Sequence, residues 1–189
     1  MSNQPKTQLV KARASLGSMK TSQSFADFEE HWKNLLHQLE RAWTKASSKY
    51  GSNQGWRAFR DKYESLRRTD PLLAYFKNAR DTDEHTIDDI VSHEPSGIGI
   101  NAAEGDSLYI ERMEISRGTI SIKSPDRIRV EFIPGKTKLL PVTKRDGTYP
   151  VPTSHLGDAI DPANIADFAA KAIAFYEKAL DEAESTFGK

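Results

Sequence analysis

An arginine and a histidine lie five positions apart in the stretch NARDTDEHT, residues 78–86. The guanidinium of Arg80 offers a fixed fork of donors that matches a phosphate. The imidazole of His85 can take or give a proton near neutral pH. Acting together, His85 would activate the ribose 2′-hydroxyl of RNA, and Arg80 would stabilise the charge that develops on the phosphorus oxygens. This chemistry needs no metal ion and spares DNA, which lacks the hydroxyl.

The order of residues in this stretch resembles a family motif. Arg80, Asp81 and His85 are similar to the R-polar-xxx-H motif of the HEPN superfamily (higher eukaryotes and prokaryotes nucleotide-binding). The resemblance spans roughly residues 24–91 and implies a helical, often dimeric protein. It further implies a metal-independent endoribonuclease of a toxin or anti-phage defence system, or an inactive relative, with these three residues as the catalytic set.

Two other interpretations of the same stretch stay open. In the first, Arg80 pairs with Asp83 or Glu84 one helical turn away, and the segment is a solvated helix face. In the second, Asp81 and His85 share a helix face and bind a divalent metal, for which carboxylate and imidazole are suitable ligands. Because no second ligand pair reinforces the metal site, we expect neither a metal nor a cofactor.

The remaining candidates are weaker. His155 lies in the loop PTSHLGD, as a site residue or as a turn residue bonded to the backbone. His31 and His37 fit surface or core-edge roles on a helix. Arg127 and Arg129 share one face of a strand, either for phosphate contact or as the wet side of a sheet. The sequence contains no nucleophile-elbow serine, Walker or dinucleotide-glycine pattern.

Composition narrows the class of protein. The 189 residues include 27 Lys and Arg, 27 Asp and Glu, and no cysteine. The balance of charge gives no global attraction to nucleic acid or membrane, and thiolate sites and disulfides are excluded. Since no apolar run is long enough for a bilayer, we expect a cytoplasmic protein with no membrane contact. The expected partners are RNA, a second copy in a homodimer, or another protein.

The chain is predicted to begin with a flexible basic arm over residues 1–21. The first 22 residues contain no acid and four cations, which are Lys6, Lys11, Arg13 and Lys20. The segment reads as polar and aperiodic, which is typical of a loose terminus. Its charge would either tether an anionic partner or have no specific role.

Three amphipathic helices follow within residues 22–92. The first begins near Ser22 or Ser24, the second ends around Thr69, and the third begins with Asp70 as its cap. The third helix is predicted to run past Ala79 and to continue through Ile87, Ile90 and Val91. Aromatic residues fall at helical spacing and are predicted to form a core rather than a base-stacking platform, namely Trp32, Trp43, Trp56, Phe59, Tyr63 and Phe76.

Short strands separated by turns predict a β-rich part over residues 96–152. Their close spacing favours an antiparallel meander of four to five strands. A long C-terminal helix is predicted over residues 161–188. The fold class is therefore α+β, with a three-helix N-terminal unit, a central sheet and a final helix in one domain over residues 22–189.

The competing functional class is a non-catalytic protein-interaction module. In that case the helical unit and the final helix would bind a protein partner. Such a module is expected to show an exposed apolar patch and no convergent pair of titratable groups.

Overall fold

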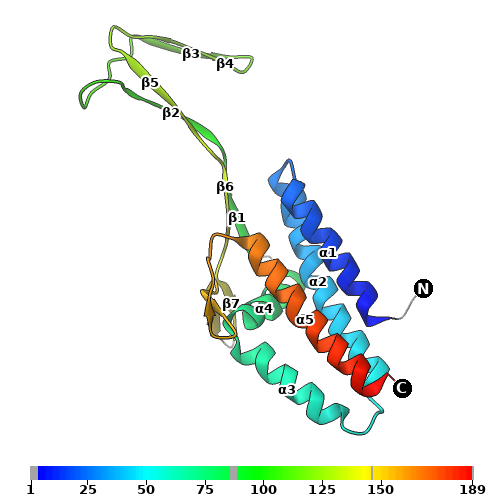
Figure 1. Cartoon of the computed structure of the whole chain (residues 1–189). Coiled ribbons are helices and arrows are strands. Elements are labelled where there is room, and N and C mark those ends of the chain that lie inside the picture. Colours follow the sequence, from blue (N-terminus) through cyan, green and yellow to red (C-terminus); the bar gives the residue numbers. More distant parts are fainter. Residues whose placement is uncertain (1–3, 86–88, 146, 189) are drawn as a thin grey trace. The chain divides into compact units, whose positions relative to one another are not determined.

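The computed structural model in Figure 1 describes residues 4–85, 89–145 and 147–188, without the side chains of residues 84 and 85. The chain forms two compact units. The helical unit comprises Met1–Ser92 and Lys138–Lys189, and the ribbon unit comprises His93–Thr137. The predicted α+β class is confirmed by the long helices and antiparallel strand pairs. The predicted single domain over residues 22–189 differs from this division into two units.

Two of the three predicted helices begin where their capping residues indicated, and the third ends where predicted. Helix α2 (Phe25–Tyr50) follows Ser24, whose side chain accepts a hydrogen bond from the backbone N–H of Asp27. Helix α3 (Trp56–Thr69) ends at the predicted residue. Helix α4 (Pro71–His85) follows Asp70, whose carboxylate accepts from Leu73 N at 3.0 Å. These caps satisfy N–H groups that have no partner within the first turn.

Helix α4 is shorter than predicted. It ends at His85, and Val91 begins strand β1 (Val91–Glu94), so the predicted continuation of the helix through Ile90 and Val91 is wrong. Ile90 instead accepts a backbone hydrogen bond from Leu140 N at 3.1 Å. Ile87 lies outside the described residues.

The predicted flexible arm is also wrong, because residues Pro5–Thr21 form helix α1. Its buried residues Leu9, Ala12, Leu16 and Met19 make one narrow stripe at spacings of three and four. This stripe packs on α2 and on helix α5 (Ile165–Phe187). The stripe has few apolar residues, so the sequence pattern gives only a weak indication of a helix. Burial against two neighbouring helices stabilises the helix in the folded chain.

Two cations of α1, Lys6 and Arg13, bind acids of α5. Arg13 donates from Nε and Nη2 to the two carboxylate oxygens of Glu177, at 2.6 and 2.5 Å. Lys6 lies 2.7 Å from Asp181 and 2.5 Å from Glu184. For these two cations, the anionic partner is therefore the C-terminal helix of the same chain.

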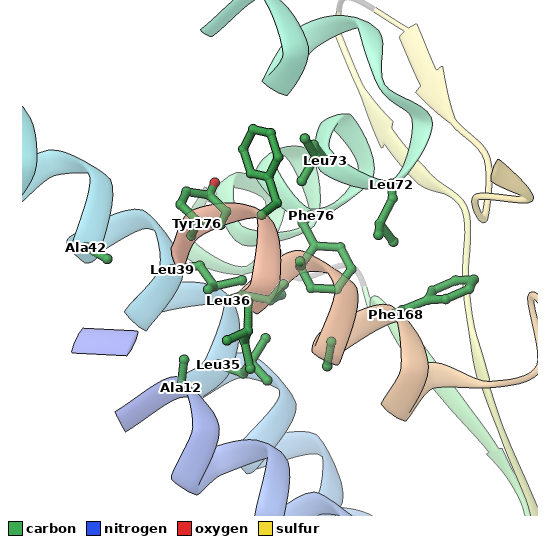
Figure 2. Packing of buried hydrophobic residues seen from close by; sticks show 14 of the residues in the cluster. Ala12, Leu35, Leu36, Leu39, Ala42, Leu72, Leu73, Phe76, Phe168 and Tyr176 are labelled. Atoms are coloured by element: carbon green, nitrogen blue, oxygen red, sulfur yellow. The ribbon is translucent and has the colours of Figure 1, made fainter. Parts of the chain in front are cut away.

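The core of the helical unit is formed by all five helices, and Figure 2 shows part of it. The predicted C-terminal helix is confirmed, although it begins at Ile165, after the cap Asn164. Trp32 meets Phe76 edge to face with ring centroids 5.1 Å apart. The predicted aromatic residues lie in or against this core, as expected, and none of the three tryptophans is exposed.

The strands form pairs rather than a meander. Every sheet in the described part of the chain has two strands. In the ribbon unit, strand β2 (Gly97–Ala102) pairs with β5 (Ile128–Ile133). Strand β3 (Arg112–Ser116) pairs with β4 (Thr119–Lys123). Strand β1 pairs with β6 (Lys136–Leu139). Two short pairs belong to the helical unit, and they are β7 (Val142–Lys144) with β8 (Gly147–Tyr149) and β9 (Ser154–His155) with β10 (Asp158–Ala159).

Two local features explain this nested pairing. Arg117 and Gly118 both have positive φ, 49° and 79°, and form a two-residue turn that closes the β3–β4 hairpin. The later turn does not close a hairpin with β5, because it is bound to a residue before β3: Tyr109 N donates to Asp126 Oδ2 at 2.8 Å, and Ser124 Oγ donates to Tyr109 O at 2.6 Å. Strand β5 is thus left to pair with β2.

Candidate functional site

The predicted catalytic residues Arg80 and Asp81 lie in the last turns of α4 and are half-buried. Arg80 Nη1 donates to Asp81 Oδ1 at 2.9 Å. Lys144 Nζ, from β7, donates to Asp81 Oδ2 at 3.2 Å and to Asn78 Oδ1 at 3.0 Å. Asp81 therefore lies between two cations, and a phosphate that bound Arg80 would compete with this carboxylate.

The pKa of Asp81 reflects two opposing effects. Burial raises it, while hydrogen bonds from Arg80 and Lys144 and their positive charges lower it. The favourable contacts outweigh burial, and the pKa lies below its ordinary value. Asp81 is consequently ionised at neutral pH and cannot serve there as a proton donor.

The third predicted residue, His85, is the last residue of α4, but its side chain lies outside what the structure describes. The convergence of Arg80 and His85 on a common pocket therefore stays a prediction. The same holds for the metal alternative that joins Asp81 to His85. Among the described residues, no group of three His, Asp or Glu side chains is placed to hold a metal ion.

A histidine on another helix does meet this part of α4. His37 of α2 lies with Nε2 3.0 Å from Asp83 Oδ2. Lys33, one turn before His37, lies with Nζ 3.2 Å from Asp83 Oδ1. A carboxylate that binds one ring nitrogen fixes the orientation of the imidazole, an arrangement that histidines use in proton transfer.

From the sequence, His37 is expected only in a surface or core-edge role. Asp83 is 46 positions away, and nothing in the local pattern of either helix links the two residues. One signal was present: His37 directly follows Leu36 and precedes Leu39 by two, so it borders the apolar stripe of α2. A polar residue on such a border is placed to meet a neighbouring helix.

A second polar cluster surrounds Arg67, whose side chain is 1% exposed. Arg67 Nε donates to Tyr176 Oη at 2.9 Å, its Nη1 donates to Glu64 at 2.5 Å, and its Nη2 donates to Glu40. The guanidinium also lies over the Trp43 ring, 5.5 Å from the centroid. Every arm of this buried cation has a partner, which is typical of a structural rather than a catalytic arginine.

A groove of about 560 Å³ lies beside this cluster and is lined by residues of α2, α3 and α4. Its lining residues include three cations and two acids, and they are Trp43, Thr44, Ser47, Arg60, Asp61, Glu64, Arg68 and Lys77. Both acids are held by cations, since Asp61 lies 3.1 Å from Arg60 and Glu64 binds Arg67. The groove can accept a small polar or anionic molecule, but its lining contains no nucleophile–base pair.

The loop histidine His155 is buried and bound to the cap of α4. Its Nδ1 lies 2.9 Å from Asp70 Oδ1, while Leu156 N donates to Asp70 Oδ2 at 2.6 Å. Asp70 thus joins the β9–β10 hairpin to the first turn of α4. Of the two interpretations of His155, the structure supports a structural role, in which it binds a carboxylate rather than the backbone.

The ribbon unit presents apolar side chains on one face of the β2–β5 pair and on one face of the β3–β4 hairpin. In the β2–β5 pair, Ile98 lies opposite Phe132, Ile100 opposite Val130 and Ala102 opposite Ile128, so all six share a face. Phe132 is 69% exposed and Val130 is 64% exposed. We call these six residues the ribbon face.

The hairpin β3–β4 repeats the pattern. Met113 pairs with Ile122 and Ile115 with Ile120, and Ile115 is 69% exposed. The other side of the β2–β5 pair is mostly polar or without side chains, since Gly99 lies opposite Glu131 and Asn101 opposite Arg129. Its one large apolar residue is Ile133, which lies opposite Gly97 at the end of the pair and is 52% exposed. Acidic residues accompany the two arginines of the predicted basic strand face. Glu131 lies on the same face as Arg129, and Arg127 forms an ion pair with Glu104 at 3.2 Å.

No helix in the described part of the chain has the length and apolar character needed to cross a membrane. Comparison of the chain with protein-family models, with curated proteins and with solved structures gave no match in any of the three. The resemblance of residues 80–85 to the HEPN motif therefore stays a prediction.

Proposed function

We propose that the chain is a protein-interaction module whose contact surface is the ribbon face. The observation that carries this proposal is the run of three apolar cross-strand pairs, Ile98–Phe132, Ile100–Val130 and Ala102–Ile128, with large side chains left exposed. Exposed apolar patches of this kind mark interaction sites in soluble proteins.

The stability of a two-stranded ribbon supports the same proposal. An isolated pair of strands is marginally stable in water and needs a covering surface or further strands. A partner that buried the ribbon face would supply this cover. Burial of each large apolar side chain would contribute about 1.5–3 kcal/mol.

The position of the surface differs from the one expected from the sequence. The interaction-module hypothesis assigned partner binding to the helical unit and to the final helix. Those helices bury their apolar stripes against one another, and Phe168, Ala172 and Tyr176 of α5 lie in the shared core (Figure 2). Most of the exposed large apolar residues in the described part of the chain lie in the ribbon unit, and the exceptions are Val10 and Leu156.

Photo-cross-linking from adjacent positions tests this function. A benzoylphenylalanine placed at position 132 reports on the ribbon face, and the same group at position 131 reports on the opposite, polar face. In the cells that make the protein, we expect a discrete protein adduct from position 132 and none from position 131. Equal labelling from both positions, or no adduct from either, would refute the proposal.

A second candidate function is the metal-independent endoribonuclease that the HEPN resemblance implies. It is favoured by the contact between His37 and Asp83, because Asp83 orients the imidazole and lies on α4 three positions after Arg80. In this candidate Arg80 would bind the phosphate and a histidine would act as general acid and base. The active residue would be His85 or His37.

Cleavage of labelled RNA in chelator tests this candidate. The purified protein is compared with the Arg80→Ala, His85→Ala and His37→Ala variants, and with His31→Ala as a matched control on α2. Loss of roughly 100-fold or more in rate on removal of Arg80 and one histidine is the expected result. Absence of cleavage, or cleavage that none of the substitutions alters, would remove the nuclease from consideration.

A further inference from the structure

We infer that the partner of the ribbon face is a second copy of this chain, which packs its own ribbon face against it about a two-fold axis. This inference rests on the proposed function and names its partner. In a two-fold contact each protomer presents the same patch, so the patch must be compatible with itself. The ribbon face meets this condition because its six residues are apolar and bring no like charges together.

The area available also fits one copy of the chain. Phe132, Val130 and Ile98 are each more than half exposed, and Ile115 and Met113 add to them from the second hairpin. A fully exposed aromatic side chain carries about 150–250 Å² and an aliphatic one less, so these five residues expose on the order of 500 Å² of apolar surface per chain. Because about 65% of a homodimer interface is apolar, an interface built around this surface would bury roughly 770 Å² on each partner. A stable interface buries about 800 Å² on each partner.

The near-neutral charge of the ribbon unit favours a protein partner that carries little net charge, and it disfavours a nucleic acid. Residues 93–137 contain six Lys and Arg and seven Asp and Glu, so the ribbon unit is close to neutral. Binding to nucleic acid depends on a surplus of cations along the contact. Interfaces between identical subunits are, in contrast, rich in apolar area and poor in charge at their centre.

The register identifies the residues closest to the centre of the contact. Ile100 and Val130 form the middle pair of the ribbon face, between Ile98–Phe132 on one side and Ala102–Ile128 on the other. If the two-fold axis passes near this pair, Val130 of one copy lies close to Val130 of the partner copy. Glu131 points to the opposite side of the ribbon and provides a matched control one position away.

Sedimentation equilibrium of the purified full chain over a range of concentrations is the first test. We expect a dimer for the unmodified chain and for Glu131→Ser. The double variant Val130→Ser/Phe132→Ser should weaken dimerisation by roughly 100-fold or more, because four apolar side chains per dimer become polar. Phe132→Leu, which keeps an apolar side chain, should remain dimeric and shows whether loss of folding explains the result.

The absence of cysteine makes a direct cross-linking test possible. Val130→Cys, treated with a short bifunctional maleimide, can be joined only to another copy of the chain. We expect a covalent dimer from Val130→Cys and little from Glu131→Cys at the same concentration. Helical circular dichroism of each variant confirms that the helical unit is intact.

The outcomes separate this inference from the proposed function. A monomeric chain at all concentrations overturns the second-copy inference, as does a dimer that survives Val130→Ser/Phe132→Ser. If the chain is monomeric but position 132 still cross-links to one other protein, the proposed function stands with a different partner. If position 132 gives no adduct and the chain is monomeric, both fail.

Discussion

Arg67 and Tyr176, which are 109 positions apart, meet inside the helical unit, with the guanidinium Nε 2.9 Å from the phenol oxygen. Because Arg67 also binds Glu40 and Glu64, one buried cation links α2, α3 and α5. Burial raises the pKa of Tyr176 to about 12, and the nearby Arg67 partly opposes that effect. The phenol therefore stays protonated at neutral pH and contributes a neutral contact.

Replacing this cation should destabilise the whole helical unit. Arg67→Ala leaves Glu40 and Glu64 without their buried partner, which typically costs about 3–5 kcal/mol. The free energy of unfolding, measured by urea titration, should fall by this amount. Arg68→Ala removes an exposed neighbour on the same helix and should change it by less than about 0.5 kcal/mol. Similar effects of the two substitutions would contradict the structural role given to Arg67.

Asp70 should contribute more than an ordinary helix cap. Its carboxylate accepts from Leu73 N, Leu156 N and the ring of His155. Asp70→Ala removes the cap and leaves buried donors unpaired, so we expect a loss of about 2–4 kcal/mol. Ser24→Ala removes an exposed cap alone and should lose about 1 kcal/mol in the same denaturation experiment. An equal loss for both would show that the contact with His155 adds nothing.

Helix α1 supplies a direct test of the corrected N-terminal segment. Leu9 is 3% exposed and its neighbour Val10 is 67% exposed. Leu9→Ala should destabilise the protein by about 2–4 kcal/mol, because it leaves a cavity between α1 and α2. Val10→Ala should have little effect. If both variants unfold at the urea concentration of the unmodified chain, the segment is a loose arm after all.

The stability of the protein should depend on pH through Asp81. Its pKa is lower in the folded chain than in the unfolded chain, so its contribution is fully present above the ordinary value of about 4. The contribution is lost as pH falls from there through the lower folded-state pKa. Asp81→Asn should therefore flatten the decline of stability below pH of about 4. Urea titrations at several pH values measure this slope.

The control for this effect is Asp158→Asn, which removes an exposed acid of strand β10. Its slope should match that of the unmodified chain. If Asp81→Asn has the same slope as the unmodified chain, the contacts with Arg80 and Lys144 do not favour the ionised carboxylate. Since Asp81 is only half-buried, the size of the change should be modest.

The sequence by itself determined the local features of the protein. Ser24 and Asp70 mark the starts of α2 and α4 because a side-chain oxygen can satisfy free N–H groups in the first turn. Alternation places β4 and β5 close to their observed bounds, and helical spacing identifies Trp32 and Phe76 as core residues. Each of these features depends on residues a few positions apart.

The tertiary structure decided which of these elements meet. Strand β5 pairs with β2 rather than with β4 because the turn before it binds Tyr109, and the apolar residues of β2 and β5 match in register. Helix α1 is stable because α2 and α5 cover its narrow stripe. The contacts of His37 with Asp83 and of His155 with Asp70 join positions 46 and 85 apart. Such contacts depend on packing between whole elements, and the spacing of residues along one element carries no information about them.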